Sequence, residues 1–238
     1  MTPQEIGTLS RWLDAFYEDP AEVTAAFADQ DFRRCIKSHS PLDGITYDPR
    51  CSYFAVYRHP IDALFSMRVH ARSIEVEFLR NRFPDDDNHA AFEMFLKDEL
   101  FGGANDAFDL HSLVYHYKSF QKWAHLPNIH LLHYADLKAD LAGEVRRIAR
   151  ILEIEERGSL VTEITEGSTF AAIKKKAAEA KSESGDFYLS ERFFNSGTSN
   201  KWDGVLDKVE LAAFDARMRE LLPEDQAAWL LWGSKGQP

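Results

Sequence analysis

Three short runs of apolar residues interrupt the mixed pattern of the chain and predict β-strands. They are "FRRCI" at 32–36, "SYFAVYR" at 52–58 and "NIHLLHY" at 128–134. β-branched and aromatic residues, which favour strands, recur in these runs, and helical patterns separate them. Strands that alternate with helices are typical of parallel sheets, because a parallel pair needs a long crossover connection. The pattern therefore favours a parallel sheet over hairpins.

Amphipathic repeats predict the helices. The stretch after Arg58 has a proline at position 60, where the start of a helix tolerates it, and apolar residues at 61, 64, 65, 69 and 76. Further helices are predicted over 90–100, 108–124, 136–152, 207–222 and 224–232. The expected fold class is α/β, in which ligands bind beyond the carboxyl ends of the strands. Lys37, Arg58 and Tyr134 all lie at such predicted ends.

One polar segment departs from these repeats. Residues 174–200 are rich in Lys, Glu, Ser and Gly, which predicts a lid or mobile loop more than a linker between domains. The chain has 238 residues, a common size for one α/β domain, and shows no internal repeat. We therefore expect a single domain over 1–238.

Composition excludes several classes of function. The formal net charge of −11 argues against binding to a nucleic-acid backbone. No apolar run approaches the roughly 18 residues that a membrane span needs, and the first residues lack the layout of a secretory signal. We expect a soluble, cytoplasmic protein without nucleic-acid or membrane partners. Cys35 and Cys51 are the only cysteines and lack metal-ligand spacing, so no metal is predicted.

Positive charge is concentrated in one part of this acidic chain. Between Asp31 and Arg82 the sequence has nine lysines and arginines and six acidic residues. A local positive excess of this kind suits a small anion. The alternative is that several of these side chains, such as Arg72 and Arg80, cover the solvent face of a helix.

A lysine and a histidine follow the first predicted strand. Side chains two apart in an extended chain point to the same side, so Lys37 and His39 in "KSHS" can share one environment. A histidine with a pKa near 6.5 can accept a proton at neutral pH. The two residues are a candidate catalytic pair.

The stretch "VYRHPIDALFS" has the features of an anion site. Arg58 closes a strand just before a helix start, and Ser66 follows within that helix. A guanidinium group close to free helical N–H groups suits a phosphate, and a hydroxyl adds a donor. A structural salt bridge between Arg58 and Asp62 is the alternative.

Four segments together resemble a known family. "KSHSPL", "YFAVYRHPIDALFS", "IHLLHYADLKADL" and "FNSGTSNKW" occur in the order and at the separations of the cytosolic sulfotransferases, and the resemblance covers nearly the whole chain. It implies a parallel sheet flanked by helices, like that of the P-loop nucleotide hydrolases. It also implies that 3′-phosphoadenosine 5′-phosphosulfate (PAPS) donates a sulfuryl group to a hydroxyl or amine of a small-molecule acceptor.

The resemblance also implies roles for individual residues. Lys37 would contact the bridging or sulfuryl oxygens of the donor, and His39 would be the general base. Arg58 and Ser66 would hold the 3′-phosphate, and Tyr134 would lie near the adenine. Further nucleotide contacts are implied for Ser168 and Phe170 in "EGSTFAAI" and for Asn195, Ser196 and Gly197 in the loop before Trp202.

The start of the sequence departs from the family pattern. The phosphosulfate loop of the type P-K-S-G-T-T-W is absent, and "MTPQEIGTLSRWLD" resembles the helix that follows it. We therefore expect the first strand of the family to be missing, and the chain as written to have little or no activity. The unpaired strand edge would favour self-association, so a homodimer is one possible assembly.

The loop before Trp202 departs as well. Asn195 and Ser196 replace an arginine–lysine pair of the family. They can donate hydrogen bonds to a phosphate but bring no charge, and charge-assisted bonds are about twice as strong as neutral ones. We expect weaker donor binding unless Lys201 compensates from the same loop.

Three functions fit these observations. The first is a PAPS-dependent sulfotransferase. The second is a catalytically silent protein of the same kind that binds a 3′-phosphoadenosine nucleotide. The third, a nucleotide kinase of related architecture, fits least well because no Walker loop is present.

Overall fold

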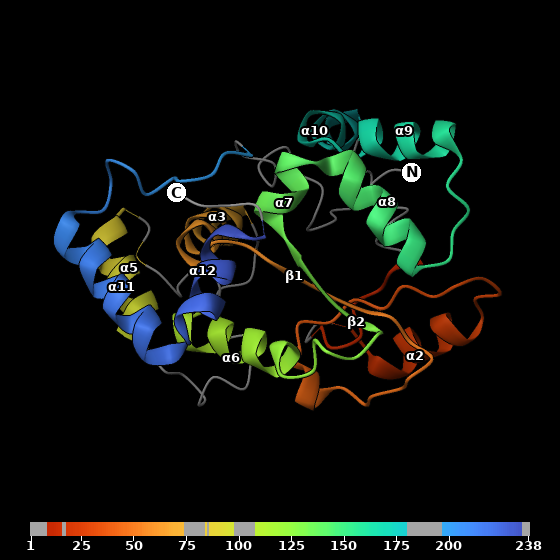
Figure 1. Cartoon of the computed structure of the whole chain (residues 1–238), viewed down its shortest axis with the longest axis horizontal. Coiled ribbons are helices and arrows are strands. Elements are labelled where there is room, and N and C mark those ends of the chain that lie inside the picture. The colour runs from red at the N-terminus through yellow and green to blue at the C-terminus, as the bar shows by residue number, and fades with distance from the viewer. Residues whose placement is uncertain are drawn as a thin grey trace.

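The computed structural model of the protein describes residues 9–15, 18–73, 84, 86–97, 108–179 and 197–234. Helices surround a pair of strands in this part of the chain (Figure 1). The elements are, in order, α2 (Pro20–Ala28), the short 3-10 helix η1 (Leu42–Gly44), β1 (Tyr53–Tyr57), α3 (Pro60–Ser73), α5 (Asn88–Lys97), α6 (Leu110–Gln121), β2 (Ile129–His133), α7 (Tyr134–Ala139), α8 (Leu141–Ile151), α9 (Gly158–Gly167), α10 (Phe170–Glu179), α11 (Lys208–Leu221) and α12 (Glu224–Trp232).

The two described strands pair in parallel, as the sequence predicted. The register runs from Tyr53 opposite Ile129 to Tyr57 opposite His133. α3, α5 and α6 form the crossover between the strands. This connection is the helical crossover that a parallel pair requires. The α/β class with a parallel sheet flanked by helices is confirmed.

The predicted strand at 32–36 is wrong. These residues lie outside any strand, and the only bridge near them in the described chain joins Lys37 to Trp12. Phe32 and Ile36 are 49% and 52% exposed, so their apolar side chains do not enter the core. β-propensity alone does not make a strand, because the ladder needs a partner along its length.

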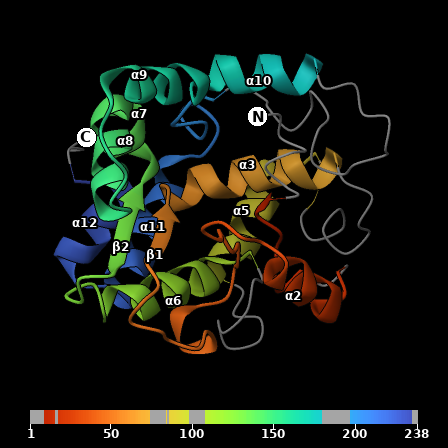
Figure 2. The same cartoon turned by 90° about the vertical axis from the view of Figure 1, so that its right-hand side faces the viewer.

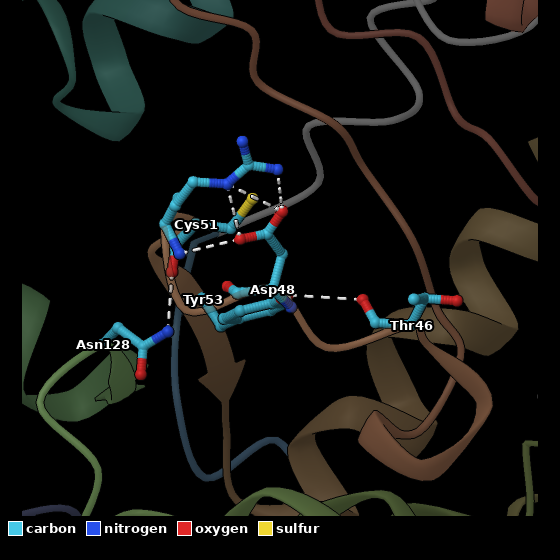
Figure 3. A network of polar contacts seen from close by, with 6 residues as sticks. Thr46, Asp48, Cys51, Tyr53 and Asn128 are labelled. Carbon is cyan, nitrogen blue, oxygen red and sulfur yellow. Dashed lines mark hydrogen bonds and ion pairs between the residues drawn. The ribbon is translucent and has the colours of Figure 1, made fainter.

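A polar network fixes the start of the sheet, at the end opposite to Arg58 (Figure 3). The Asp48 amide donates to the Tyr53 hydroxyl at 2.8 Å, and this hydroxyl donates to the Thr46 carbonyl at 3.4 Å. The side-chain amide of Asn128 donates to the Cys51 carbonyl at 2.8 Å. These bonds tie the loop before β1 to the start of β2 and help to hold the register.

The main core lies between the sheet and the helices α5, α6, α11 and α12, which gather on one side of the strands in Figure 1. Tyr117 and Trp229 stack there, and Tyr57 meets both rings edge-on, with centroids 5.3–6.0 Å apart. Fully burying a large apolar side chain contributes about 1.5–3 kcal/mol. The core therefore anchors the carboxyl end of β1, where Tyr57 lies.

His59 joins β1 to α3 and holds the loop before α11. Its Nδ1 atom accepts a hydrogen bond from the Ile61 amide at 3.3 Å, in the first turn of the helix. The buried ring stacks on Trp202 with a centroid distance of 4.1 Å. Trp232 and Phe214 lie next to it, at centroid distances of 5.0 and 5.8 Å.

The predicted helices are found, with one break. The helix expected over 136–152 is two helices, because Asp140 leaves helical geometry at φ −150° and ψ 71°. Its carboxylate then caps α8 by accepting the Gly143 amide at 2.9 Å. Residues 174–179 of the predicted lid belong to α10, and 180–196 lie outside the described residues. Within the described chain, no helix is long and apolar enough to cross a membrane.

Candidate functional site

Arg58 and Tyr134 meet where the two strands end. Each directly follows its strand, and Tyr57 and His133 before them are paired in the sheet. The guanidinium carbon lies 4.5 Å from the centre of the Tyr134 ring, within the range of a cation–π contact. The register therefore positions both residues, because it fixes which two residues emerge side by side.

Arg58 has two further partners, and one of its buried donors has none among the described residues. Its Nη2 atom lies 3.4 Å from the Asp62 carboxylate and donates to the Thr198 carbonyl at 2.8 Å. The salt bridge that the sequence offered as an alternative thus exists. The buried Nε atom, however, has no hydrogen-bond partner among the described residues. A buried donor without a partner is costly, and a hydrogen bond to a ligand oxygen would relieve that cost.

The loop at 197–202 folds onto this arginine. Asp62 is buried and accepts hydrogen bonds from the Asn200 and Lys201 amides, both at 3.2 Å. The Gly197 carbonyl accepts from the Tyr134 hydroxyl at 3.4 Å and from the Lys138 amine at 3.3 Å. Segments far apart in the sequence thereby share one site.

Gly197 brings the backbone close to an aromatic ring. Its φ of +62° is in the left-handed region, and a Cβ atom there would lie 2.8–2.9 Å from the Phe170 ring. Phe170 starts α10, and Ser168 caps the end of α9 by donating its amide to Ile164 at 2.9 Å. Figure 2 shows the segment before α11 passing between α3 and the α9–α10 pair. Phe170 and Gly197 are therefore brought together with Arg58 and Tyr134.

Positive charge exceeds negative charge in this cluster. Arg58, Lys138 and Lys201 contribute cations, and Asp62 is the carboxylate among their described partners. Burial, and then repulsion from Arg58, lowers the pKa of Lys201, while the attraction of Asp62 opposes the shift. Arg58 and Lys201 share the single carboxylate of Asp62, and such an excess of positive charge favours binding of an anion. We call Arg58, Asp62, Tyr134, Lys138, Phe170, Gly197 and Lys201 the arginine cluster.

Lys37 and His39 form a second group around Trp12. The Lys37 amine lies 4.5 Å from the centre of the indole ring, and the His39 ring centroid lies 4.1 Å from it. Both site residues therefore contact one aromatic side chain, as the prediction of a shared environment required. Lys37 forms an isolated parallel bridge with Trp12, and neither Lys37 nor His39 lies in a strand.

Helix α3 links the two groups. Burial, followed by the charge of Lys37, lowers the pKa of His70, so that lysine lies close to the third turn of the helix. Ser66 is half-buried one turn before His70 and one turn after Asp62. Because an α-helix rises 1.5 Å per residue, Asp62 and His70 are about 12 Å apart along the axis. Ser66 therefore lies between the two groups along the helix, and no hydrogen bond joins it to Arg58 within the described chain.

Two predicted site residues lie outside the described part of the chain, and some residues of the site were not predicted from the sequence. Asn195 and Ser196 lie outside the described residues. Lys138 and the double role of Asp62 were not predicted. The spacing of four residues between Tyr134 and Lys138 on one helix face was a usable signal. No group of three or more His, Cys, Asp or Glu residues in the described chain is arranged to hold a metal ion.

Comparison with known proteins identifies the family. The model of the sulfotransferase domain matches residues 2–226. The chain belongs to the sulfotransferase family. It is therefore a transferase whose general reaction is sulfuryl transfer, as the four sequence segments implied.

Bacterial and human relatives are similar over different lengths. A glycolipid sulfotransferase of Mycobacterium bovis (strain BCG / Pasteur 1173P2) is 30% identical, and the match covers 98% of this chain and 80% of the relative. Glycolipid sulfotransferase Rv1373 of Mycobacterium tuberculosis gives the same values. Sulfotransferase 6B1 of Homo sapiens is 22% identical over 77% of this chain and 55% of its own.

Two solved structures share the fold of this sulfotransferase. Mouse sulfotransferase SULT7A1, complexed with PAP, has a TM-score of 0.69 and 19% identity, covering 89% of this chain and 73% of its own. Retinol dehydratase, in a complex with retinol and PAP, has a TM-score of 0.71 and 19% identity, covering 92% and 71%. The fold predicted from the alternating strands and helices is thus shared with these two proteins.

Proposed function

We propose that this protein transfers the sulfuryl group of PAPS to a hydroxyl or amine of a small-molecule acceptor. The observation that carries the proposal is the buried Nε donor of Arg58, which has no partner among the described residues and lies in a positively charged cluster at the strand ends. A guanidinium group binds phosphate through several N–H donors at once. The 3′-phosphate distinguishes PAPS and its product PAP from ordinary adenine nucleotides, and Arg58 supplies a matching site.

The other members of the arginine cluster suit the remainder of the nucleotide. Lys138 and Lys201 add charge to the phosphate site and offset the neutral residues at 195 and 196. The rings of Tyr134 and Phe170 flank the loop at Gly197 and offer apolar surfaces for the adenine. The PAP named in the two solved complexes supports a nucleotide of this class.

Lys37 and His39 suit the reacting end of the donor. In the proposed step, the acceptor oxygen or nitrogen forms a bond to sulfur while the bond from sulfur to the phosphate oxygen breaks. His39 takes the proton of the acceptor, and PAP leaves with the bonding electron pair. Lys37 places a positive charge near the leaving oxygen, where negative charge develops. The mycobacterial relatives are named for glycolipids, so hydroxyl groups of glycolipids head the panel of acceptors to test.

Nucleotide binding tests the phosphate site. In Arg58→Ala, the affinity for PAP should fall by about 1.5–3 kcal/mol, the range for hydrogen bonds to charged groups, while binding of 5′-AMP changes little. Isothermal titration calorimetry measures both. Arg50→Ala is the matched control, because Arg50 pairs with Asp48 in the loop before β1 and lies at the other end of the sheet. Equal losses for the two ligands, or none for PAP, would contradict the proposal.

Turnover tests the base. His39→Gln should lower kcat by about 10²–10⁴-fold, the usual contribution of general base catalysis, while PAP still binds. Transfer of label from PAPS to a panel of alcohols, glycolipids and amines gives the rate. His125→Gln, at an exposed histidine, is the control. A rate that His39→Gln leaves unchanged would remove His39 from the mechanism.

A further inference from the structure

Asp14 holds the segment that carries His39. One oxygen of its carboxylate, Oδ2, accepts hydrogen bonds from three consecutive residues. The hydroxyls of Ser38 and Ser40 donate to it at 2.7 and 2.6 Å. The backbone amides of His39 and Ser40 donate at 3.2 and 3.1 Å. All four bonds are charge-assisted, which makes each stronger than a bond between neutral groups.

Hydrogen bonds together have a larger effect on the pKa of Asp14 than burial has. Partial burial would raise the pKa of Asp14, but the bonds from Ser40, Ser38 and the His39 backbone lower it below 3.8. Asp14 is therefore an anion at any pH suited to a histidine base. These four hydrogen bonds therefore persist at neutral pH.

Segment 38–40 has one hydrogen bond of its own, from the Ser40 amide to the Ser38 hydroxyl at 2.9 Å. In the described chain, the nearest strand-like contact is the single bridge between Trp12 and Lys37. The Leu13 amide donates to the Lys37 carbonyl at 3.1 Å, and the chain beyond this bond is held by Asp14. Trp12 contacts the His39 ring from the same short segment. Residues 12–14 thus contact both the backbone and the imidazole ring of His39.

We propose that Asp14 is a positioning residue that orients His39 toward the acceptor. The inference rests on the proposed function of His39 as the base. A base must reach its proton within hydrogen-bond distance, and misplacement by about 1 Å can cost 10²-fold in rate. The sheet does not fix His39, because residues 32–36 form no strand. Asp14 supplies that constraint from another segment.

A double-mutant cycle tests this role. Asp14→Ala should lower kcat by about 10–100-fold, with the KM for PAPS nearly unchanged, because the donor site is untouched. Asp14→Asn keeps one acceptor and should fall between Asp14→Ala and the parent protein. In a His39→Ala background, Asp14→Ala should cost almost nothing more, because its effect passes through His39. Equal fold-losses in both backgrounds overturn the proposal.

Hydrogen exchange provides a readout that does not depend on turnover. In Asp14→Ala, peptides that span 38–40 should exchange faster, because the His39 and Ser40 amides lose the Asp14 carboxylate, and the Ser40 amide keeps only its bond to the Ser38 hydroxyl. Asp19→Ala is the control, since Asp19 caps α2 through the Ala21 amide. It should leave exchange at 38–40 and kcat unchanged. Unaltered exchange in Asp14→Ala overturns the proposal, whereas an unchanged kcat in His39→Ala shows first that the base assignment is wrong, and the positioning role fails with it.

Discussion

Acid should destabilise this fold through His59. Its ring is enclosed by Trp202, Trp232 and Phe214, and its Nδ1 atom must be unprotonated to accept the Ile61 amide. Burial above all lowers the pKa of His59 from 6.5 to about 3, and repulsion from His133 and Arg58 adds to the shift. Protonation would place an unpaired charge in the core and remove the acceptor at the start of α3.

The magnitude follows from the two pKa values. Between pH 6.5 and pH 3 the unfolded chain binds a proton at this site, but the native ring stays neutral. The free energy of unfolding therefore falls as the pH is lowered through this window. At pH 5 the loss is about RT ln 30, or about 2 kcal/mol. This is a large part of the 5–15 kcal/mol by which domains are typically stable.

Urea unfolding at pH 7.5, 6 and 5 measures the effect. His59→Asn keeps an acceptor for the Ile61 amide but does not titrate. Between pH 7.5 and pH 5 its free energy of unfolding should therefore fall by about 2 kcal/mol less than that of the parent. It should be less stable than the parent at pH 7.5, because the ring contacts are lost. His125→Asn, at an exposed site, should keep the parent slope. Burial also lowers the pKa values of His70, His130 and His133, so some acid sensitivity will persist. A slope in His59→Asn equal to that of the parent would refute the reasoning.

Two substitutions test the loop of the arginine cluster. Gly197→Ala should reduce stability by about 1–2 kcal/mol, the cost of a left-handed conformation, and weaken PAP binding because the new Cβ displaces Phe170. Denaturation and calorimetry would show this, and wild-type values in both would contradict it. Asp62→Asn should reduce the free energy of unfolding by about 1.5–3 kcal/mol, because two amides and Arg58 lose a charged partner. Unaltered urea unfolding would count against this role of Asp62.

Features set by local pattern could be predicted from the sequence. The strands at β1 and β2 have apolar runs of the right length, and their ends place Arg58 and Tyr134 correctly. The helix after β1 was visible from its proline and its apolar spacing. Parallel pairing then brings the two strand ends together without further information, since the fold class implies it.

Features set by contacts between distant segments could not be predicted in this way. Asp62 binds amides that lie 138 and 139 residues away. Asp14 accepts hydrogen bonds from residues 24–26 positions further along the chain, and no sequence motif links it to them. The run at 32–36 has the composition of a strand but finds no ladder in the described chain. In each case the outcome depends on which distant segment provides the partner, and this cannot be inferred from a single sequence.

The pairing of β1 with β2 also limits how the gene can change. Arg58 and Tyr134 meet because five paired positions in each strand precede them. A substitution within the ladder, such as at Val56, which is 60% exposed, leaves this spacing intact. Deleting one codon from either strand shifts one residue past the other by about 3.3 Å and turns its side chain to the opposite face. In these strands, length is therefore far more restricted than the identity of the individual residues.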